Sequence, residues 1–287
     1  MELLGFDVDA RGVTGVVIDG HGKVLRRARV DGDHVTALGA AFAQLGSKTY
    51  DAFGIASEIE LGDLGLSKKT VPRSRQHRCT PGAAAVAAEA WVGAARQARH
   101  AICLWIGDRV LAGVLMNGEP WLGAHGLAGA AGWLALNPVE RQDYRQFGSF
   151  AAEVSNRGIA RRLAWRIQAG DDSTVLARAG SLEAITATHV FEGARAGDGV
   201  AISVVRDTAR YVGMATANLI ATFDPEVIVL GGPIAAAGDL LLEPARQECC
   251  RRVPPAMLNQ LRFEISPLAG NGIAIGAASL ALVARQS

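Results

Sequence analysis

A charged turn follows the first apolar run of the chain, and its residue types are ones that phosphate chemistry uses. The run Leu4–Phe6 leads to Asp7, and Asp9, Ala10 and Arg11 come next. An arginine can attract a phosphate through its charge and its paired N–H donors. Ala10 and Arg11 stand where glycines would let backbone N–H groups approach phosphate oxygens. The turn therefore lacks the small residues that phosphate binding needs.

A second segment of this kind is Gly107–Gly113, which joins one predicted strand to the start of the next. If a phosphate approached this segment, the negative charge of Asp108 would repel it, and Arg109 and Leu111 would place side chains in the same space. Two interpretations of Arg11 and Arg109 remain open. The arginines attract a phosphate, or they fill or salt-bridge an empty cleft; we favour the second.

Alternating strands and helices must position these turns. Short apolar runs predict strands at Leu3–Phe6, Val13–Ile18, Val24–Arg29, Ala52–Ala56, Ala101–Ile106, Val110–Met116, Pro225–Leu230 and Phe263–Pro267. Helical spacing predicts helices at Val35–Leu45, Pro81–Ala98, Arg145–Arg166, Gly199–Phe223, Leu240–Arg252 and Gly272–Ala284. Hairpins followed by helices occur twice, so we predict a duplicated α/β architecture with a cleft between its halves.

The Ala-rich helix has clear start signals. Thr80 is a typical N-cap, and Pro81 suits the first helical position. The stretch before it, Ser67–Arg78, is polar and basic and predicts a loop. Its cations could meet an acidic partner or a nucleic acid. Because no aromatic residues alternate with them, we interpret this stretch as a solvated surface.

Composition narrows the class of protein. The chain has 287 residues, of which 49% are hydrophobic and 20% charged, and its net charge is +1. We expect a soluble, cytoplasmic protein without a membrane span or a general attraction to nucleic acid. The cysteines lack the spacing of a metal site, so we expect reduced thiols and no zinc. They are Cys79, Cys103, Cys249 and Cys250.

Four segments together resemble the ROK family, which groups repressors, open reading frames and sugar kinases. They are Glu89–Ala94, Gly123–Gly129, Asn218–Gly232 and Leu268–Ala278. The resemblance implies two actin-like domains of the ribonuclease H and hexokinase type, with ATP and a sugar in the cleft and often a dimer. On this basis we predict a smaller domain of residues 1–104 plus the C-terminal helix 273–287, and a larger domain of residues 105–272.

The resemblance also shows what is missing from the kinase chemistry. Active members have an Asp as general base after an Asn at the start of the Ala-rich helix, and this chain has Thr80 and Pro81 there. A proline cannot accept a proton, and losing a general base costs roughly 10²–10⁴ in rate. Asp7 stands where the family positions magnesium and phosphate. It is either a remnant of that site or the cap of a neighbouring turn, and we favour the cap.

The sugar side of the family's site is altered as well. Ala130–Trp133 replaces a Glu-x-x-Gly-His-like stretch, and Val139–Ser149 lacks the zinc cysteines. His125 and Trp133 are the candidate sugar-site remnants, although we interpret His125 mainly as a turn residue. Gly54–Ser57 replaces a Gly-x-Pro-Gly turn. Three acids near the expected sugar mouth are either a relocated base or solvated loop residues: Glu58, Glu60 and Asp63.

Glycines of the family's nucleotide region remain at Gly231, Gly232, Gly270 and Gly276. They either bind a nucleotide or are required by tight turns and helix–strand packing, and the sequence favours neither. ATP and Mg²⁺ therefore stay open as ligands.

The leading hypothesis is a catalytically degenerate sugar-kinase homologue that binds a small carbohydrate or nucleotide, or regulates, without phosphoryl transfer. It is expected to be a homodimer. The alternative is an active, glucokinase-like carbohydrate kinase that depends on ATP, with an unusual substrate and relocated catalytic residues. A DNA-binding sugar repressor is not favoured, because the chain begins two residues before its first predicted strand and leaves no room for a helix-turn-helix segment.

Overall fold

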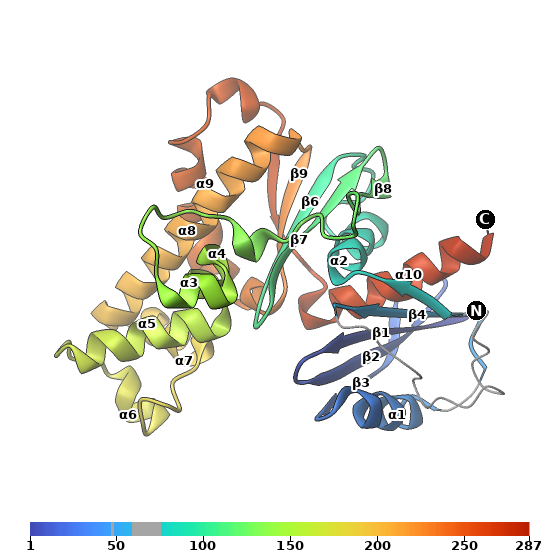
Figure 1. The fold of residues 1–287 in the computed structure, drawn as a ribbon, viewed down its shortest axis with the longest axis horizontal. Helices are drawn as coiled ribbons and strands as arrows, with labels where there is room; N and C mark the ends of the chain where they lie inside the picture. The colour runs from blue at the N-terminus through green and yellow to red at the C-terminus, as the bar shows by residue number, and fades with distance from the viewer. Residues whose placement is uncertain (47–48, 59–75, 287) are drawn as a thin grey trace. The chain divides into compact units, whose positions relative to one another are not determined.

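The computed structural model describes residues 1–46, 49–58 and 76–286 (Figure 1). The chain divides into two compact units. The first unit comprises Met1–Cys103, Ala112–Gly129 and Ser266–Ser287, and the second comprises Leu104–Leu111 and Ala130–Ile265. The domain boundaries expected from the sequence stay a prediction.

A five-stranded sheet forms the centre of the first unit, in the order β3-β2-β1-β4-β5. Its strands are β1 Glu2–Asp9, β2 Gly12–Asp19, β3 Val24–Asp31, β4 Ala52–Ser57 and β5 Gln76–Cys79. The pairs β1–β2 and β2–β3 are antiparallel, while β1–β4 and β4–β5 are parallel. The carboxyl ends of β1, β4 and β5 therefore lie at one edge of the sheet.

Both faces of this sheet are covered by helices. Phe6, Phe42 and Phe53 belong to a core cluster on the face toward α1 (His34–Gln44). The opposite face carries α10 (Gly272–Gln286), which also packs against α2 (Pro81–Trp91). That approach needs a glycine, because a Cβ on Gly5 would lie 1.9 Å from the carbonyl oxygen of Ala274. Apolar residues on alternate strand positions thus bury both faces.

The second sheet has the order β10-β9-β6-β7-β8. Its strands are β6 Ala101–Ile106, β7 Val110–Met116, β8 Glu119–Pro120, β9 Val227–Gly231 and β10 Arg262–Ile265. The helices of the second unit are α3 Gln142–Phe147, α4 Ser149–Val154, α5 Asn156–Gln168, α6 Val175–Ala179, α7 Ala187–Arg195, α8 Gly199–Phe223 and α9 Gly238–Cys250. The predicted mixed α/β class, with two sheets, is confirmed.

Three predicted elements differ clearly from the structure. The helix expected over Pro81–Ala98 ends at Trp91, because Val92 leaves the helical conformation with φ −131° and the N–H of Ala94 donates to the Glu89 side chain instead of continuing the helix. The helix expected over Arg145–Arg166 is three helices, because Gly148 has φ +85° between α3 and α4, and Ser155 caps α5 by accepting the N–H of Gly158. The stretch Ser67–Arg78 is expected to be a loop throughout. Its last three residues belong to β5 instead, because they pair with β4; residues 67–75 lie outside the described part.

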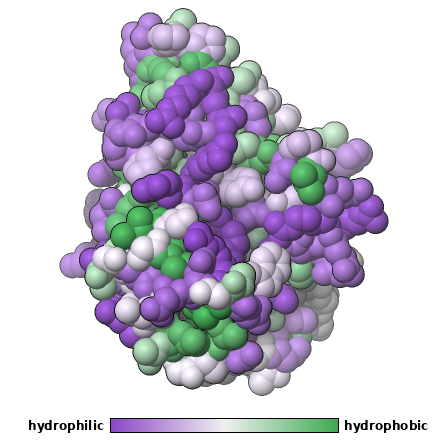
Figure 2. All heavy atoms as spheres, turned by 90° about the vertical axis from the view of Figure 1, so that its left-hand side faces the viewer, coloured by the Kyte–Doolittle hydropathy of each residue, from purple (hydrophilic) through white to green (hydrophobic). Residues whose placement is uncertain are grey.

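Among the described residues, no helix combines the length and hydrophobicity that crossing a membrane would require. Figure 2 shows one face of the molecule, on which hydrophilic side chains occupy much of the surface and hydrophobic ones form separate patches. All four cysteines are unbridged thiols.

Candidate functional site

Open α/β sheets bind ligands beyond the carboxyl ends of their parallel strands. The candidate ligand site is therefore the edge of the first sheet where β1, β4 and β5 end. Asp7 pairs with Ala56, and Ala56 pairs with Cys79, so these three residues form one row across the sheet. Asp7 is buried there, with 4% of its surface exposed. The row leads directly to Thr80 and Pro81.

The turn between β1 and β2 binds its own carboxylate. Asp9 Oδ1 accepts the backbone N–H groups of Arg11 at 2.8 Å and of Gly12 at 3.0 Å. Asp9 Oδ2 accepts a hydrogen bond from Arg29 Nη1 at 2.8 Å. Backbone N–H groups at a tight turn are the donors that a bound anion would use. Here a side chain of the same turn accepts them, and Arg29 neutralises its charge.

The path of this turn is set by the neighbouring strand. Gly12 has φ +155°, and a Cβ there would lie 2.1 Å from the carbonyl oxygen of Val30. The N–H of Gly32 donates to the carbonyl of Arg11 at 2.8 Å, and the side chain of Arg11 is exposed. The glycine of the turn therefore serves the contact with β3.

The start of α2 carries no carboxylate. Thr80 Oγ1 accepts the N–H of Ala83 at 3.2 Å, so its hydroxyl is used as the helix cap, and Pro81 is buried in the first turn. Burial, followed by the charge of Asp7, raises the pKa of the Cys79 thiol to about 12. Neither a proline nor a thiol that stays protonated can take a proton from a sugar hydroxyl at neutral pH.

The acid of α2 lies further along the helix and is engaged elsewhere. Glu89 is buried and accepts hydrogen bonds from the Ser266 hydroxyl and from the N–H of Ala94. Burial raises the pKa of Glu89, while its hydrogen bonds with Ser266 and Ala94 act in the opposite direction. Glu89 thus joins α2 to the segment before α10.

The turn between β6 and β7, in the second unit, is also held by internal contacts. The N–H of Gly107 donates to the carbonyl of Arg109 at 2.9 Å, and the N–H of Asn156 donates to the carbonyl of Gly107 at 2.9 Å. The Asn156 side chain donates to Asp108 Oδ1 at 3.3 Å. Arg109 is half-buried and Asp108 is exposed. These contacts attach the turn to the start of α5.

The four glycines predicted to contact a nucleotide differ in whether packing within the protein requires a glycine at their position. A Cβ on Gly276 would lie 1.7 Å from the carbonyl oxygen of Ala84, and one on Gly232 (φ +83°) would lie 2.6 Å from that of Ile106. Packing alone therefore requires both. Gly270 faces open space, with no atom within 4 Å of the position that a Cβ would take, and Gly231 is buried at the end of β9.

The remaining predicted residues are at the surface. His125 is exposed in a turn after β8, in the first unit. Trp133 is 60% exposed in the 3₁₀ helix Ala131–Trp133, in the second unit. Glu58 is exposed at the end of β4. Glu60 and Asp63 lie outside the described residues.

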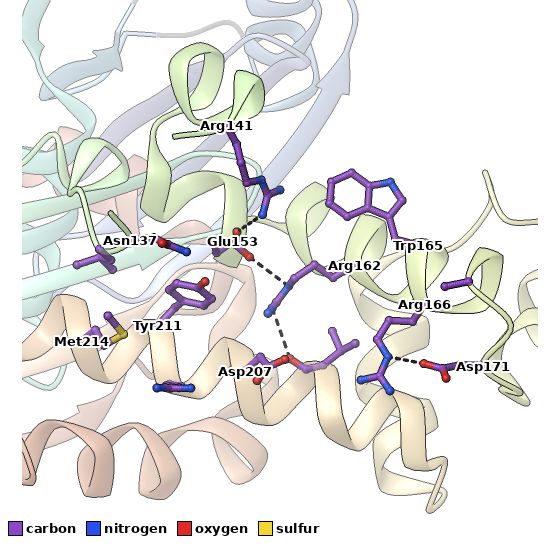
Figure 3. Close-up of a pocket in the computed structure, with 14 residues that line it drawn as sticks. Asn137, Arg141, Glu153, Arg162, Trp165, Arg166, Asp171, Asp207, Tyr211 and Met214 are labelled. Carbon is purple, nitrogen blue, oxygen red and sulfur yellow. Dashed lines mark hydrogen bonds and ion pairs between the residues drawn. The ribbon is translucent and has the colours of Figure 1, made fainter. Parts of the chain in front are cut away.

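The structure also contains a polar pocket that the sequence did not indicate. It lies within the second unit and is lined by side chains of α4, α5 and α8 (Figure 3). The one available signal, the spacing of Arg162 and Arg166 four residues apart on one helix, is weak, because Arg162 pairs with Glu153 of α4 and Arg166 with Asp171 after α5. Among the described residues, no three His, Cys, Asp or Glu side chains gather as a metal site.

Comparison with known proteins relates the chain to one family. The model of the ROK family matches residues 81–284. The chain belongs to the ROK family. A glucokinase of Halalkalibacterium halodurans is 32% identical over 66% of this chain and 58% of its own length, so the match spans less than two thirds of that relative. A putative xylose repressor of Caldicellulosiruptor is 24% identical over 68% of this chain and 49% of its own length.

A solved structure extends the likeness to the whole chain. A ROK glucokinase of Streptomyces griseus, in complex with glucose and AMPPNP, superposes with a TM-score of 0.85 at 24% identity and covers 100% of both chains. The predicted actin-like fold of the sugar kinases is thereby confirmed. This ROK protein has both glucokinase and repressor relatives.

Proposed function

We propose that this ROK protein is a pseudoenzyme: a cytoplasmic, homodimeric sugar-kinase homologue that binds a small carbohydrate or nucleotide without transferring a phosphoryl group. The observation that carries the proposal is the start of α2. Its cap is Thr80, its first residue is the buried Pro81, and its first turn contains no acidic residue. The resemblance to active ROK kinases implies a general base at this position.

The β1–β2 turn supports the same conclusion. A phosphate that entered it would have to displace Asp9 from the N–H groups of Arg11 and Gly12. The Asp9 carboxylate is part of the turn and loses no translational or rotational freedom when it accepts these hydrogen bonds. A free phosphate would lose that freedom, so it competes poorly with Asp9. Phosphoryl transfer depends on positioning and charge neutralisation at the phosphates, and this turn supplies its amide donors to itself.

The glucokinase relatives suggest which ligand remains. The glucokinase of Streptomyces griseus was solved with glucose and AMPPNP, and by this likeness we expect a sugar or a nucleotide to bind here. Gly270, whose surroundings are open, is the best candidate for a nucleotide contact among the four glycines. Asp7 is then a structural residue of the sheet row, and magnesium is bound only together with a nucleotide.

The test is a screen of the purified protein for ATP-dependent phosphorylation of hexoses, amino sugars and cyclitols, alongside calorimetric titration with the same sugars and with ATP–Mg and ADP–Mg. We expect no turnover and binding of at least one sugar or nucleotide. Turnover of any of these substrates would refute the proposal.

The exposed Glu58 at the end of β4 favours a second candidate, an active carbohydrate kinase with a relocated base. If turnover is found, Glu58→Gln separates the two roles of that residue. A loss of kcat of about 10²-fold or more, with KM retained, assigns Glu58 as the base. An unchanged kcat shows that Glu58 is a solvated surface residue without a catalytic role.

A further inference from the structure

The polar pocket of the second unit has a volume of about 650 Å³, the size of a small-metabolite site. Four arginines and three acids line it, so cationic side chains are in excess. The arginines are Arg141, Arg162, Arg166 and Arg210, and the acids are Glu153, Asp171 and Asp207. Figure 3 shows side chains of α5 and α8 converging on it.

Glu153, at the floor of the pocket, is 2% exposed and is fully engaged. Its Oε1 accepts hydrogen bonds from Tyr144 at 2.5 Å and from Arg141 Nη1 at 2.9 Å, and its Oε2 lies 3.6 Å from Arg162 Nε. Arg141 also forms a two-point contact with Asp143. One buried carboxylate is therefore shared by two guanidinium groups.

Arg162 reaches into the pocket with donor capacity to spare. Its hydrogen bonds both come from Nη2, to the carbonyl of Val204 at 3.4 Å and to the hydroxyl of Thr208 at 2.5 Å. Within the described part of the chain, Nε has no hydrogen-bond partner. Burial lowers the pKa of Arg162, while the charges of Glu153 and Asp207 act in the opposite direction. Nε is buried and faces the Glu153 carboxylate at 3.6 Å, so of the five N–H donors of the guanidinium those of Nη1 are left for an anion.

Two further arginines stand at the mouth of the pocket. Arg166 donates from Nε to Asp171 and from Nη1 to Ser203 at 2.8 Å. Arg210 is 65% exposed and its Nε lies 3.8 Å from Glu248, too far for a hydrogen bond. Arg210 is therefore available to turn toward a ligand at low cost.

Trp165, one of the two aromatic side chains of the pocket, is less suited to stacking a neutral sugar. Two guanidinium groups already lie over the ring of Trp165, that of Arg141 at 5.4 Å and that of Arg161 at 4.6 Å. The donors, rather than the ring, are what a ligand would meet.

We propose that this pocket binds a small metabolite through an oxyanion, a phosphate monoester or a carboxylate, held by Arg162, Arg166 and Arg210. The polar groups of Asn137, Asp207 and Tyr211 at the same pocket would meet hydroxyl groups of the ligand. This site is built from residues of the second unit alone and uses none of the residues assigned to the kinase chemistry, so its test does not depend on kinase activity.

The experiment is calorimetric titration of the whole protein with inorganic phosphate, glucose 6-phosphate, gluconate and, as the neutral probe, glucose. We expect at least one of the three anions to bind at millimolar concentration or tighter, and its affinity to fall with added salt. If inorganic phosphate or glucose 6-phosphate binds and gluconate does not, the pocket is a phosphate site. If only gluconate binds, the pocket is a carboxylate site. No binding of any anion, or binding of glucose as tight as that of glucose 6-phosphate, overturns the proposal.

Variants locate the binding. Arg166→Gln and Arg210→Gln each remove one charged donor and should weaken the anion about tenfold or more. Arg246→Gln is the matched control, because Arg246 is an exposed arginine of α9 paired with Glu243, and it should change nothing. Circular dichroism confirms that each variant is folded. Anion binding that none of the pocket variants weakens places the anion elsewhere and also overturns the proposal.

Discussion

Arg29 on β3 donates from Nη1 to Asp9 Oδ2 at 2.8 Å, while the other carboxylate oxygen of Asp9 accepts the N–H groups of the β1–β2 turn. The carboxylate is therefore placed where backbone donors converge, and its counter-ion comes from the next strand. The hydrogen bond with Asp9 is the main cause that raises the pKa of Arg29. This pair explains why a turn with an accessible arginine need not be a phosphate site.

Replacing Asp9 by alanine should destabilise the protein by about 1–2 kcal/mol, because the change removes two backbone caps and an ion pair that is only partly exposed. The free energy of unfolding is measured by urea denaturation. Asp31→Ala is the control: Asp31 also pairs with Arg29, but its side chain is 76% exposed, so its loss should cost less than about 0.5 kcal/mol. Equal effects would mean that the caps contribute nothing.

Glu153→Ala should cost about 3–5 kcal/mol, because it leaves Arg141 and Arg162 without their shared buried carboxylate. Thermal unfolding followed by circular dichroism measures the change. Glu140→Ala provides the comparison, since Glu140 pairs with Arg145 at the surface with 67% of its side chain exposed. A fall in melting temperature no larger than that of the control would contradict the assigned role of Glu153.

Glu89 predicts a pH effect. A carboxyl whose pKa is raised in the folded state binds more protons when the protein is folded. The free energy of unfolding therefore falls as the pH rises from 4.5, the ordinary pKa of a glutamate, through the raised pKa of Glu89. Glu89→Gln keeps the shape, accepts from the N–H of Ala94 and donates to Ser266, but cannot ionise. Denaturation at several pH values should show the variant gaining stability over the wild type as pH rises.

The comparison for Glu89 is Glu119→Gln, which alters an exposed glutamate of β8. This variant controls for the removal of one negative charge from the protein. A stability difference between Glu89→Gln and the wild type that stays constant from acidic to alkaline pH would show that the pKa of Glu89 is not raised.

Two glycine variants separate packing from nucleotide binding. Gly276→Ala should destabilise the protein by about 1–3 kcal/mol, because its Cβ would collide with the backbone of Ala84. Gly270→Ala meets open space and should change stability by less than about 0.5 kcal/mol. If a nucleotide binds, Gly270→Ala should weaken it without loss of stability. A stability loss at Gly270 equal to that at Gly276 would undo this distinction.

Local patterns predicted the elements whose signals lie within a few residues. The long helix α8 was predicted with its bounds, and Thr80 and Pro81 were predicted as the cap and first residue of α2, because caps and helical spacing are properties of short segments. The break at Gly148 was missed. It depends on the close contact between Gly148 and the carbonyl oxygen of Gly132, where a Cβ would lie 2.2 Å away, and that contact is tertiary.

The candidate sites depended even more on distant contacts. Asp9 was noted only as a charge, because its partner Arg29 is twenty residues away on another strand. The arginine pocket needs α5 beside α8, and Glu153 from α4 beneath both. No single stretch of sequence contains that arrangement. Short helices α6 and α7 were not predicted at all.

The packing of α10 against β1 and α2 has a consequence for biosynthesis. The helix α10 is synthesised after β1 and covers one face of it, through the contact of Ala274 with Gly5. Until residues 272–286 have been made, Leu3, Val16 and Ile18 on that face lack their partners Ala274 and Ala278. The nascent chain therefore carries an unfinished apolar surface while residues 20–271 are added, and a premature stop near residue 270 would produce a client for chaperones and proteases.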